Sequence, residues 1–492
     1  MPASQPPNLI FLFSDQHRGD WMRCAGHPFA HTPNLDQLAG AGTRFTQAYC
    51  NYPLCGPSRM SVMTGRHPYR NDITINEHCL PSDIPTMAHA LACAGYETIL
   101  AGRMHFSGPD QRHGFQKRYV GDLNACMAGG PNAMGPPPMR RAAGNAAGAA
   151  CHLGTGDCPG LHFDEAVTRA CEHILARPRP QPLFLTAGFF LPHHPFFVPE
   201  AYFQAALERI PADDTPLPPL DRESAHPFEQ FQHPFVTAPD LTPEKRRQIR
   251  ALYAAMITWL DERLGRVIDL AKQLPGETLI LYSSDHGEFA CDYDRIGKVS
   301  FLEPSLQVPL ILARFQDGEP FGPQSTTCDN PVSLLDVAPT FIEAATAEPP
   351  SILDGDSLLP LLEKPESANT PNWTERPVFA ELAITVGKLD YPASRLLRRG
   401  DFKLHYHHTL PLRLFNVRED PHEQHDLAGD PKYAALRDAM LAQLLDGWNP
   451  DLVKARARAR SVDSAYLAEW GRQGQGPEGE VFDPSRDPTL PL

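Results

Sequence analysis

The stretch NLIFLFSDQ (Asn8–Gln16) begins as a continuous apolar run and ends in polar residues. A continuous apolar run, rather than an alternating one, is typical of a strand that is buried on both faces of a parallel sheet. We therefore predict five buried parallel strands. The other four are YETILAG (Tyr96–Gly102), PLFLTAG (Pro182–Gly188), TLILYSS (Thr278–Ser284) and VPLILA (Val308–Ala313).

Helical patterns lie between these strands. In TPNLDQLAGAG, Thr32 is placed as an N-cap, Pro33 as the first helical residue and Gly42 just past the end. A long amphipathic stretch, Pro243–Leu274, precedes the fourth strand. Strands that alternate with helices in this way predict an α/β sheet with helices on both faces.

The length of the chain indicates more than one domain, because 492 residues exceed the size at which one core usually stops growing. After about residue 377 the apolar runs become shorter, as in VFAELAI and LRLFNV, which favours a small antiparallel sheet. We predict an α/β domain over 1–375, a C-terminal antiparallel-sheet subdomain over 376–448, and a tail over 449–492 that forms an arm or an oligomer contact.

The net charge of −15 argues against a nucleic-acid-binding surface, because phosphate binding needs a basic footprint. The N-terminus, MPASQPPNLIFLFSDQ, has no basic region and no long apolar run followed by small residues, so we predict no signal peptide. No stretch approaches the roughly 18 apolar residues of a membrane span. The eleven cysteines have no paired spacing, so we predict that they are reduced thiols. Together these features predict a cytoplasmic protein with no membrane contact.

Polar side chains follow four of the predicted strands. Ligands bind outside the carboxyl ends of the strands in open α/β sheets, so one pocket could collect these side chains. They are Asp15 and Gln16, Arg103 and His105, His193 and His194, and Asp285 and His286.

Two of these strand ends together predict a metal site. Asp15, Gln16, Asp285 and His286 would supply mostly oxygen ligands and one imidazole, which suits Ca²⁺ or Mn²⁺ better than zinc. The alternative interpretation is that each motif only caps a helix or forms a turn. Two such motifs at separate strand ends, with His and Arg at two others, favour a site.

Cys55 lies in NYPLCGPSRMSVMTGR (Asn51–Arg66), at or just before the start of a predicted short helix. That position lowers the pKa of a thiol and also binds anions. Arg59, Arg103 and Lys298 could add cations for a phosphate-like or sulfate-like group. The residues alone thus predict a metal-assisted site for a tetrahedral oxyanion. They leave Cys55 open as a nucleophile, a metal ligand, a buried spacer or the precursor of another group.

The stretch CGPSR (Cys55–Arg59), followed by MTGR (Met63–Arg66), resembles the type I sulfatase signature, Cys-x-Pro-Ser-Arg with Thr-Gly-Arg behind it. The resemblance covers most of the chain, and RMHFSGPDQRHGF and SDHGE…GKVSFLE are similar to the choline-sulfatase and phosphonate-monoester-hydrolase branch of the alkaline phosphatase superfamily. It implies an alkaline-phosphatase-like α/β fold: a large mixed, mostly parallel sheet sandwiched by helices, with a smaller C-terminal α+β domain.

In that family the signature cysteine is oxidised to formylglycine by a formylglycine-generating enzyme. The resemblance therefore implies that Cys55 is the precursor of an aldehyde, whose hydrate supplies the nucleophile. It also implies one divalent ion, Ca²⁺ or Mn²⁺. Its ligands would be Asp15, Gln16, Cys55, Asp285 and His286.

The resemblance also implies a mechanism. One hydroxyl of the hydrated aldehyde, activated by the metal and Asp285, attacks sulfur, and the alcohol leaves with a proton from His193 or Lys298. His105 then takes the proton of the second hydroxyl as the covalent sulfate ester collapses to the aldehyde. Substrate contacts would come from Arg103, His193 and Lys298, and contacts to the diol from Arg59.

The chain departs from the family pattern at three positions. Gln16 and His286 stand where many sulfatases have aspartate and asparagine, which lowers the negative charge around the ion and softens the site. Both changes favour Mn²⁺ over Ca²⁺ and the phosphonate-ester branch. Arg103 stands where the family usually has lysine; it can bind an oxyanion but is a poor proton donor.

We therefore expect an enzyme, a sulfatase that hydrolyses a small alkyl or aryl sulfate ester. The nearest alternative is a phosphonate monoester or phosphodiester hydrolase with the same machinery. An alternative of another class is a non-catalytic scaffold in which Cys55 is unconverted. Substrate choice would lie in the Ala125–Gly160 loop, the Ile210–Pro239 insertion and the C-terminal domain, and the tail predicts a homo-oligomer, either a dimer or a tetramer.

Overall fold

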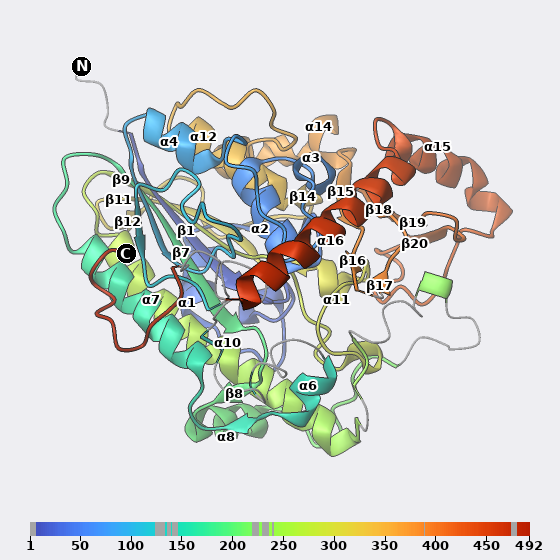
Figure 1. Cartoon of the computed structure of the whole chain (residues 1–492), viewed down its shortest axis with the longest axis horizontal. Helices are drawn as coiled ribbons and strands as arrows, with labels where there is room; N and C mark the ends of the chain where they lie inside the picture. The colour runs from blue at the N-terminus through green and yellow to red at the C-terminus, as the bar shows by residue number, and fades with distance from the viewer. Residues whose placement is uncertain are drawn as a thin grey trace.

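In the computed structural model, one large sheet lies between two layers of helices, and a smaller domain lies beside it (Figure 1). The structure describes residues 6–123, 133–134, 139, 146–218, 226–228, 236–238, 241–387, 389–473 and 480–492. Among these residues, nine strands form the main sheet in the order β13-β2-β11-β9-β1-β7-β4-β5, with β12 paired to β11. Their bounds are β1 (Asn8–Asp15), β2 (Gly42–Phe45), β4 (Glu97–Gly102), β5 (Lys117–Tyr119), β7 (Leu183–Pro192), β9 (Glu277–Ser284), β11 (Leu310–Gln316), β12 (Glu319–Pro320) and β13 (Thr326–Cys328).

The sheet is mixed and mostly parallel, as predicted. Strand β1 runs parallel to β7 and β9, and β4 runs parallel to β5 and β7. Strand β11 runs antiparallel to β9 and β2, so the prediction of a parallel strand over Val308–Ala313 was wrong in direction. Its continuous apolar run reports burial on both faces, and a buried antiparallel strand inside a mixed sheet has the same pattern.

The two faces of β1 belong to two separate cores. Leu9 and Phe11 pack into one core with residues of α2 (Cys55–Thr64), α4 (Met87–Cys93) and α12 (Val337–Ala344). Ile10 and Leu12 pack into the other core with residues of α1 (Pro33–Gly40), α7 (Pro159–Leu175) and α10 (Pro243–Ala271). Helices therefore cover both faces of the sheet, which confirms the predicted α/β sandwich (Figure 1).

The helix ends follow the sequence signals closely. Helix α1 begins at Pro33, but the hydroxyl of Thr32 donates to the Asp36 carboxylate instead of capping the helix backbone. Helix α2 begins at Cys55 itself and ends before Gly65, which has the left-handed φ of 64° that favours glycine. The signature cysteine is thus the first residue of a buried helix.

A smaller α+β domain follows the main sheet. Its four described strands form an antiparallel sheet in the order β15 (Val378–Leu382), β18 (Ser394–Arg399), β19 (Phe402–His407) and β20 (Arg413–Asn416). Helix α15 (Ala434–Leu445) packs on this sheet through Met440 and Leu444. The smaller domain with an antiparallel sheet is confirmed, whereas the boundaries at residues 375 and 448 stay predictions.

The tail returns to the main sheet of its own chain. Helix α16 (Pro450–Arg472) crosses the molecule (Figure 1). Its Val453 and Ala457 lie in one buried cluster with Trp448. Residues 480–492 then lie along the edge of the sheet next to β5, where Val481 bridges to Asp122. The C-terminus therefore lies beside the N-terminal half of the fold.

Shorter elements connect these parts. The short helices are η1 (Arg23–Ala25), α3 (Pro68–Asn71), α6 (Ala146–Cys151), α8 (Glu200–Arg209), η2 (Asp292–Asp294), α11 (Glu303–Leu306), η3 (Leu334–Asp336), α13 (Leu359–Glu363), η4 (Pro365–Asn369), α14 (Pro371–Thr374) and η5 (Pro431–Tyr433). The short strands are β3 (Ala48–Tyr49), β6 (Gly154–Thr155), β8 (Phe197–Val198), β10 (Gln307–Val308), β14 (Val332–Ser333), β16 (Thr385–Val386) and β17 (Leu389–Asp390). Much of the predicted 125–160 loop and 210–239 insertion lies outside the described residues.

Within the described ranges, no helix combines the length and the apolar character that crossing a membrane requires. The ten cysteines in that part of the chain are free thiols.

Buried histidines make the fold sensitive to acid. Burial lowers the pKa of His17 and His27 to about 4 and the pKa of His67 and His78 to about 3. At pH 5 these side chains are neutral in the folded protein, whereas in the unfolded chain, with a pKa near 6.5, they bind protons. The free energy of unfolding therefore falls as the pH drops below about 6.5.

Buried carboxyl groups act in the opposite sense. Burial raises the pKa of Asp164 to about 8, of Glu381 to about 7 and of Asp261 to about 6. The folded protein keeps these protons where the unfolded chain has released them, so stability is lost as the pH rises through about 4 to 8.

We expect these two effects to place the maximum of stability near pH 6.5. Below that pH the larger set of buried histidines dominates, and above it only the carboxyl groups titrate. Urea unfolding midpoints at pH 5, 6.5 and 8 check this, and a midpoint that rises steadily from pH 5 to pH 8 would contradict it.

Candidate active site

The carboxyl ends of β1, β4, β7 and β9 deliver polar side chains to one place. Asp15 ends β1, Arg103 follows β4, His193 follows β7 and Asp285 follows β9. All four are buried, and Asp15 is fully inaccessible. The four strand ends therefore bring these polar side chains together at one edge of the sheet.

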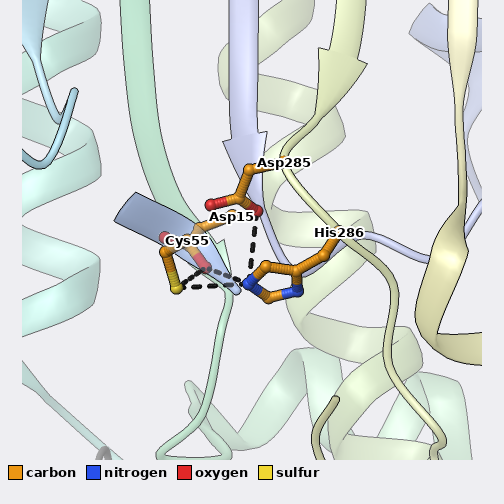
Figure 2. A group of neighbouring side chains, drawn as sticks. All are labelled: Asp15, Cys55, Asp285 and His286. Atoms are coloured by element: carbon orange, nitrogen blue, oxygen red, sulfur yellow. Dashed lines mark hydrogen bonds and ion pairs between the residues drawn. The ribbon is translucent and has the colours of Figure 1, made fainter. Parts of the chain in front are cut away.

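Asp15, Cys55, Asp285 and His286 form a compact group there (Figure 2). One potential ligand atom from each residue lies within 4.8 Å of the others. The Cys55 sulfur is 3.2 Å from His286 Nε2 and 3.7 Å from Asp15 Oδ1. His286 Nε2 is 3.7 Å from Asp15 Oδ1 and 3.6 Å from Asp285 Oδ1.

This donor set fits a divalent cation. Two carboxylates and one imidazole suit a hard or borderline ion such as Ca²⁺ or Mn²⁺. The other ring nitrogen of His286, Nδ1, lies 3.0 Å from the Gly287 carbonyl oxygen and donates to it. That contact leaves the Nε2 lone pair free to point toward Asp15, Cys55 and Asp285, as expected of a metal-binding histidine.

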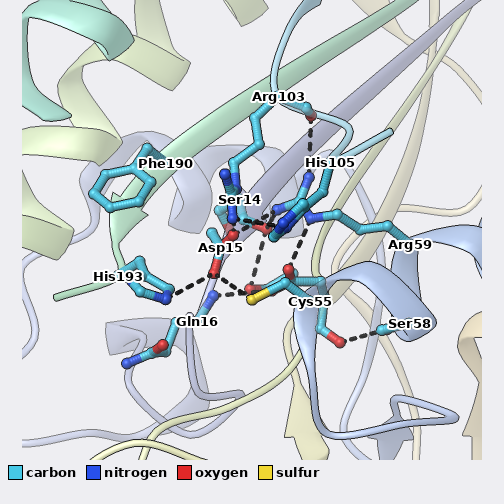
Figure 3. Close-up of polar contacts among 12 residues, drawn as sticks. Ser14, Asp15, Gln16, Cys55, Ser58, Arg59, Arg103, His105, Phe190 and His193 are labelled. Carbon is cyan, nitrogen blue, oxygen red and sulfur yellow. Dashed lines mark hydrogen bonds and ion pairs between the residues drawn. The ribbon is translucent and has the colours of Figure 1, made fainter. Parts of the chain in front are cut away.

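Arg59 links the two carboxylates. It is fully buried; Nε donates to Asp285 Oδ2 at 2.8 Å, and Nη2 donates to Asp15 Oδ2 at 3.2 Å (Figure 3). The remaining Arg59 contacts are to the backbone carbonyls of Ser14 and Arg103. Its predicted contact to a diol at position 55 stays a prediction.

Arg103 also donates to the Asp15 carboxylate. Its Nε donates to Asp15 Oδ2 at 2.6 Å. Burial alone would raise the pKa of Asp15, but the charges of Arg103, Arg59 and Lys298 outweigh it and hold that pKa well below its usual range. Asp15 is therefore an anion at every physiological pH, which a cation ligand requires.

A pair of glycines lets the chain bring Arg103 to this place. Gly102 and Gly188 pair between β4 and β7, and the Arg103 amide donates to the Gly188 carbonyl at 2.8 Å. A Cβ atom on Gly188 would overlap the Arg103 backbone, and Gly102 has a left-handed φ of 86°.

Cys55 is not a thiolate in this setting. Burial, together with the negative charge of Asp15, raises the pKa of its thiol to about 12. The sequence-based expectation of a lowered thiol pKa at the helix start was therefore wrong, because desolvation outweighs the helix dipole. A protonated thiol is a weak nucleophile, so Cys55 is better suited to be a precursor than a working thiol.

The two histidines beside the group are neutral. Burial and the charge of Arg103 lower the pKa of His105 to about 3, and burial and the charge of Lys298 lower that of His193 well below 6.5. His105 Nδ1 accepts from Arg103 Nη2 at 2.9 Å, so its ring proton is on Nε2. His193 Nε2 is 2.8 Å from Lys298 Nζ and accepts from it.

The Gln16 side chain points away from Cys55 (Figure 3). Its amide oxygen accepts from Lys298 Nζ at 2.5 Å, and its amide nitrogen contacts His194 Nδ1 at 2.8 Å and donates to Glu288. Its role as a metal ligand stays a prediction. Lys298 and His194 thus also lie at the site.

Two acidic residues at the site were not singled out from the sequence. Glu288 accepts from the Gln16 amide and from the backbone amides of Ala290 and Gly297, and burial raises its pKa to about 7. Asp122 accepts from Arg103 and from the backbone of His105. Strand β5, which carries the chain to Asp122, has only three residues, too few for a readable pattern.

The fold and the site define a hydrolase of the alkaline phosphatase superfamily. The chain belongs to the sulfatase family: the family model described as "Sulfatase" matches residues 7–347. A second model, "N-sulphoglucosamine sulphohydrolase, C-terminal", matches residues 291–449. By class the chain is a sulfuric ester hydrolase.

Two relatives align over nearly the whole chain. A choline-sulfatase of Rhizobium meliloti (strain 1021) is 31% identical, over 95% of this chain and 92% of that protein. A multifunctional alkaline phosphatase superfamily protein, PehA of Trinickia caryophylli, is 30% identical, over 87% and 92%. The crystal structure of a phosphonate monoester hydrolase of Agrobacterium radiobacter has the same fold, with a TM-score of 0.71 at 23% identity over 92% and 96% of the two chains.

We expect replacement of Arg59 to cost far more stability than loss of a surface ion pair. In Arg59→Met, two buried carboxylates lose their shared partner, which lowers the free energy of unfolding of the metal-free protein by about 3–5 kcal/mol. The matched control is Arg472→Met, whose ion pair with Glu469 is exposed to solvent and contributes far less to stability. Urea unfolding of both variants checks this, and equal losses would contradict it.

Proposed function

We propose that the chain hydrolyses the sulfate ester of a small organic alcohol through formylglycine made from Cys55, with one divalent metal ion. The observation that carries the proposal is the position of Cys55. It begins a buried helix with its sulfur 3.2 Å from His286 Nε2 and 3.7 Å from Asp15, among residues of the sulfatase family signature. The name of the 31% identical relative, choline-sulfatase, supports a sulfate ester as the substrate class.

The residues present fit both groups that this chemistry needs. Asp15, Asp285 and His286 would hold the metal ion, beside position 55. When bound, the ion would supply positive charge that activates a nucleophilic hydroxyl and stabilises the transferred oxyanion. Formylglycine at position 55 would supply that hydroxyl from its hydrate. The imidazole of His286 favours Mn²⁺ over Ca²⁺.

Arg103 and Lys298 are the cations available to bind the oxygens of the sulfate group. Both are buried beside Asp15, where a charged donor is stronger than in water. His193, neutral and in contact with Lys298 at 2.8 Å, keeps the Lys298 ammonium aimed at the site. Because His193 holds no proton to give at Nε2, we assign the proton that the leaving alcohol takes to Lys298.

His105 would take the proton of the final step. It is neutral at physiological pH, as a base must be. The lone pair available is that of Nδ1, to which Arg103 Nη2 donates at 2.9 Å, so this Arg103 contact has to loosen as the proton arrives.

The second candidate function is that of a phosphonate monoester or phosphodiester hydrolase with the same residues. Gln16 and His286, which differ from the common sulfatase pattern, favour it, and so does the name of the phosphonate monoester hydrolase with the same fold. The remaining alternative is a scaffold with unconverted Cys55. The site with its buried ion pairs intact argues against that alternative.

We expect faster turnover of nitrophenyl sulfate than of a matched nitrophenyl phenylphosphonate, measured as kcat/KM for each ester. Cys55→Ala should lower either rate roughly a thousandfold or more, because the nucleophile is lost. Cys93→Ser, at an exposed free cysteine, is the control and should keep the activity. A faster phosphonate reaction would favour the second candidate function, and no turnover of either ester with no metal uptake would favour the scaffold.

We also propose a homo-oligomer, a dimer or a tetramer, that contacts through the second half of α16. There Tyr466 is 75% exposed and Val462 58% exposed, with Leu467 and Trp470 on the same part of the helix. A sedimentation mass equal to one chain would contradict it. A formylglycine-generating enzyme as partner and a cytoplasmic location stay predictions from the sequence.

A further inference from the structure

Asp122 lies next to Arg103 and His105, three residues after the end of β5. Its side chain is buried, and each of its two oxygens accepts a hydrogen bond at the site. Oδ1 accepts from Arg103 Nη1 at 2.9 Å, and Oδ2 accepts from the backbone amide of His105 at 2.8 Å. The Asp122 carboxylate thus binds two residues of the proposed mechanism, Arg103 and His105. It is not one of the four residues that could hold a metal ion.

Arg103 depends on this contact for its orientation. Its guanidinium makes three divergent contacts: Nε to Asp15, Nη1 to Asp122 and Nη2 to His105. These contacts come from three different nitrogens of one planar group, whereas the three donors of a lysine ammonium all sit on one nitrogen, so a lysine could not make all three contacts at these positions. The hydrogen bond to Asp122 is therefore a contact that arginine can make at position 103 and that lysine would lose.

The backbone of His105 is under strain that Asp122 counters. His105 has a φ of 60°, in the left-handed region that a residue with a side chain adopts only when its surroundings hold it. The hydrogen bond from its amide to Asp122 Oδ2 is such a restraint.

The C-terminal tail in turn holds Asp122. The Asp122 amide donates to the Glu480 carbonyl at 2.9 Å, and the Phe482 amide donates to the Asp122 carbonyl at 2.8 Å. The Phe482 ring packs edge-on against Phe163, with the ring centroids 5.3 Å apart. Gly121, with a φ of 82°, passes so close to Glu480 that a Cβ atom there would overlap the Glu480 carbonyl.

We infer that Asp122 is a positioning residue that aims Arg103 and His105, and that residues 480–482 form a strap that fixes Asp122. This inference rests on the proposed function for its kinetic consequence. The physical link itself, from the strap through Asp122 to the His105 backbone, does not depend on which ester is cleaved.

The direct test is Asp122→Asn in the full-length, metal-loaded protein. Asparagine has the same size, but an NH2 donor replaces one of the two carboxylate oxygens, so one of the two present hydrogen bonds, from Arg103 or from the His105 amide, is lost. We expect kcat on the preferred nitrophenyl ester to fall roughly tenfold to a hundredfold, the size of a small misplacement of catalytic groups, with a smaller change in KM. Asp438→Asn, at an exposed carboxylate on α15, is the matched control and should keep both constants.

A double-mutant cycle with Arg103→Lys separates positioning from a merely structural role. Because Arg103→Lys already removes the hydrogen bond from Arg103 to Asp122, Asp122→Asn should lower kcat by a smaller factor in that background, where only the His105 contact remains to be lost, than in the wild-type protein. Losses that simply multiply, or wild-type kinetics in Asp122→Asn, would overturn the inference.

Hydrogen exchange at the His105 amide gives a readout that needs no activity. We expect faster exchange in Asp122→Asn and also in Phe482→Ala, which loosens the strap without touching the site. Unchanged exchange in both variants would overturn the inference. If the wild-type protein cleaves neither ester, the proposed function fails, and the exchange data still decide the role of Asp122.

Discussion

The structure of the site depends on one constraint: two carboxylates, Asp15 and Asp285, are fully buried at the ends of adjacent parallel strands. Charges that close together in a dry environment repel unless cations separate them. Arg59 supplies that charge from the first turns of α2, and Arg103 supplies more from the end of β4. The same arginine contact that neutralises the pair also fixes helix α2, and therefore Cys55, against the strand ends.

This arrangement explains why Cys55 suits a modification rather than thiol chemistry. The two anions that a metal ion needs are the groups that, with burial, keep the thiol protonated. A hydroxyl from an aldehyde hydrate has no such conflict, because it becomes a nucleophile only when positive charge is bound beside it. The neutral state of His105 and His193 follows from the same crowding of cations and from burial.

Much of this could be predicted from the sequence. Continuous apolar runs located β1, β4, β7 and β9, and the polar residues after them located Asp15, Arg103, His193 and Asp285, because strand ends share one edge of the sheet. The direction of β11 could not be predicted, since burial on both faces looks alike in either direction. The thiol pKa of Cys55 was predicted with the wrong sign, because desolvation depends on three-dimensional packing. The role of Asp122 could not be predicted, because the residues that hold it, Glu480 and Phe482, lie more than 350 residues away in the sequence.

The measurement that tests the central claim most directly is the mass of the tryptic peptide Phe45–Arg59. It would be taken after thiol alkylation, from protein made alongside a formylglycine-generating enzyme. The peptide contains Cys50 and Cys55, so Cys50 serves as the internal control. The account predicts one alkylated cysteine, Cys50, and an aldehyde at position 55. Two alkylated cysteines in protein that cleaves the ester would contradict it.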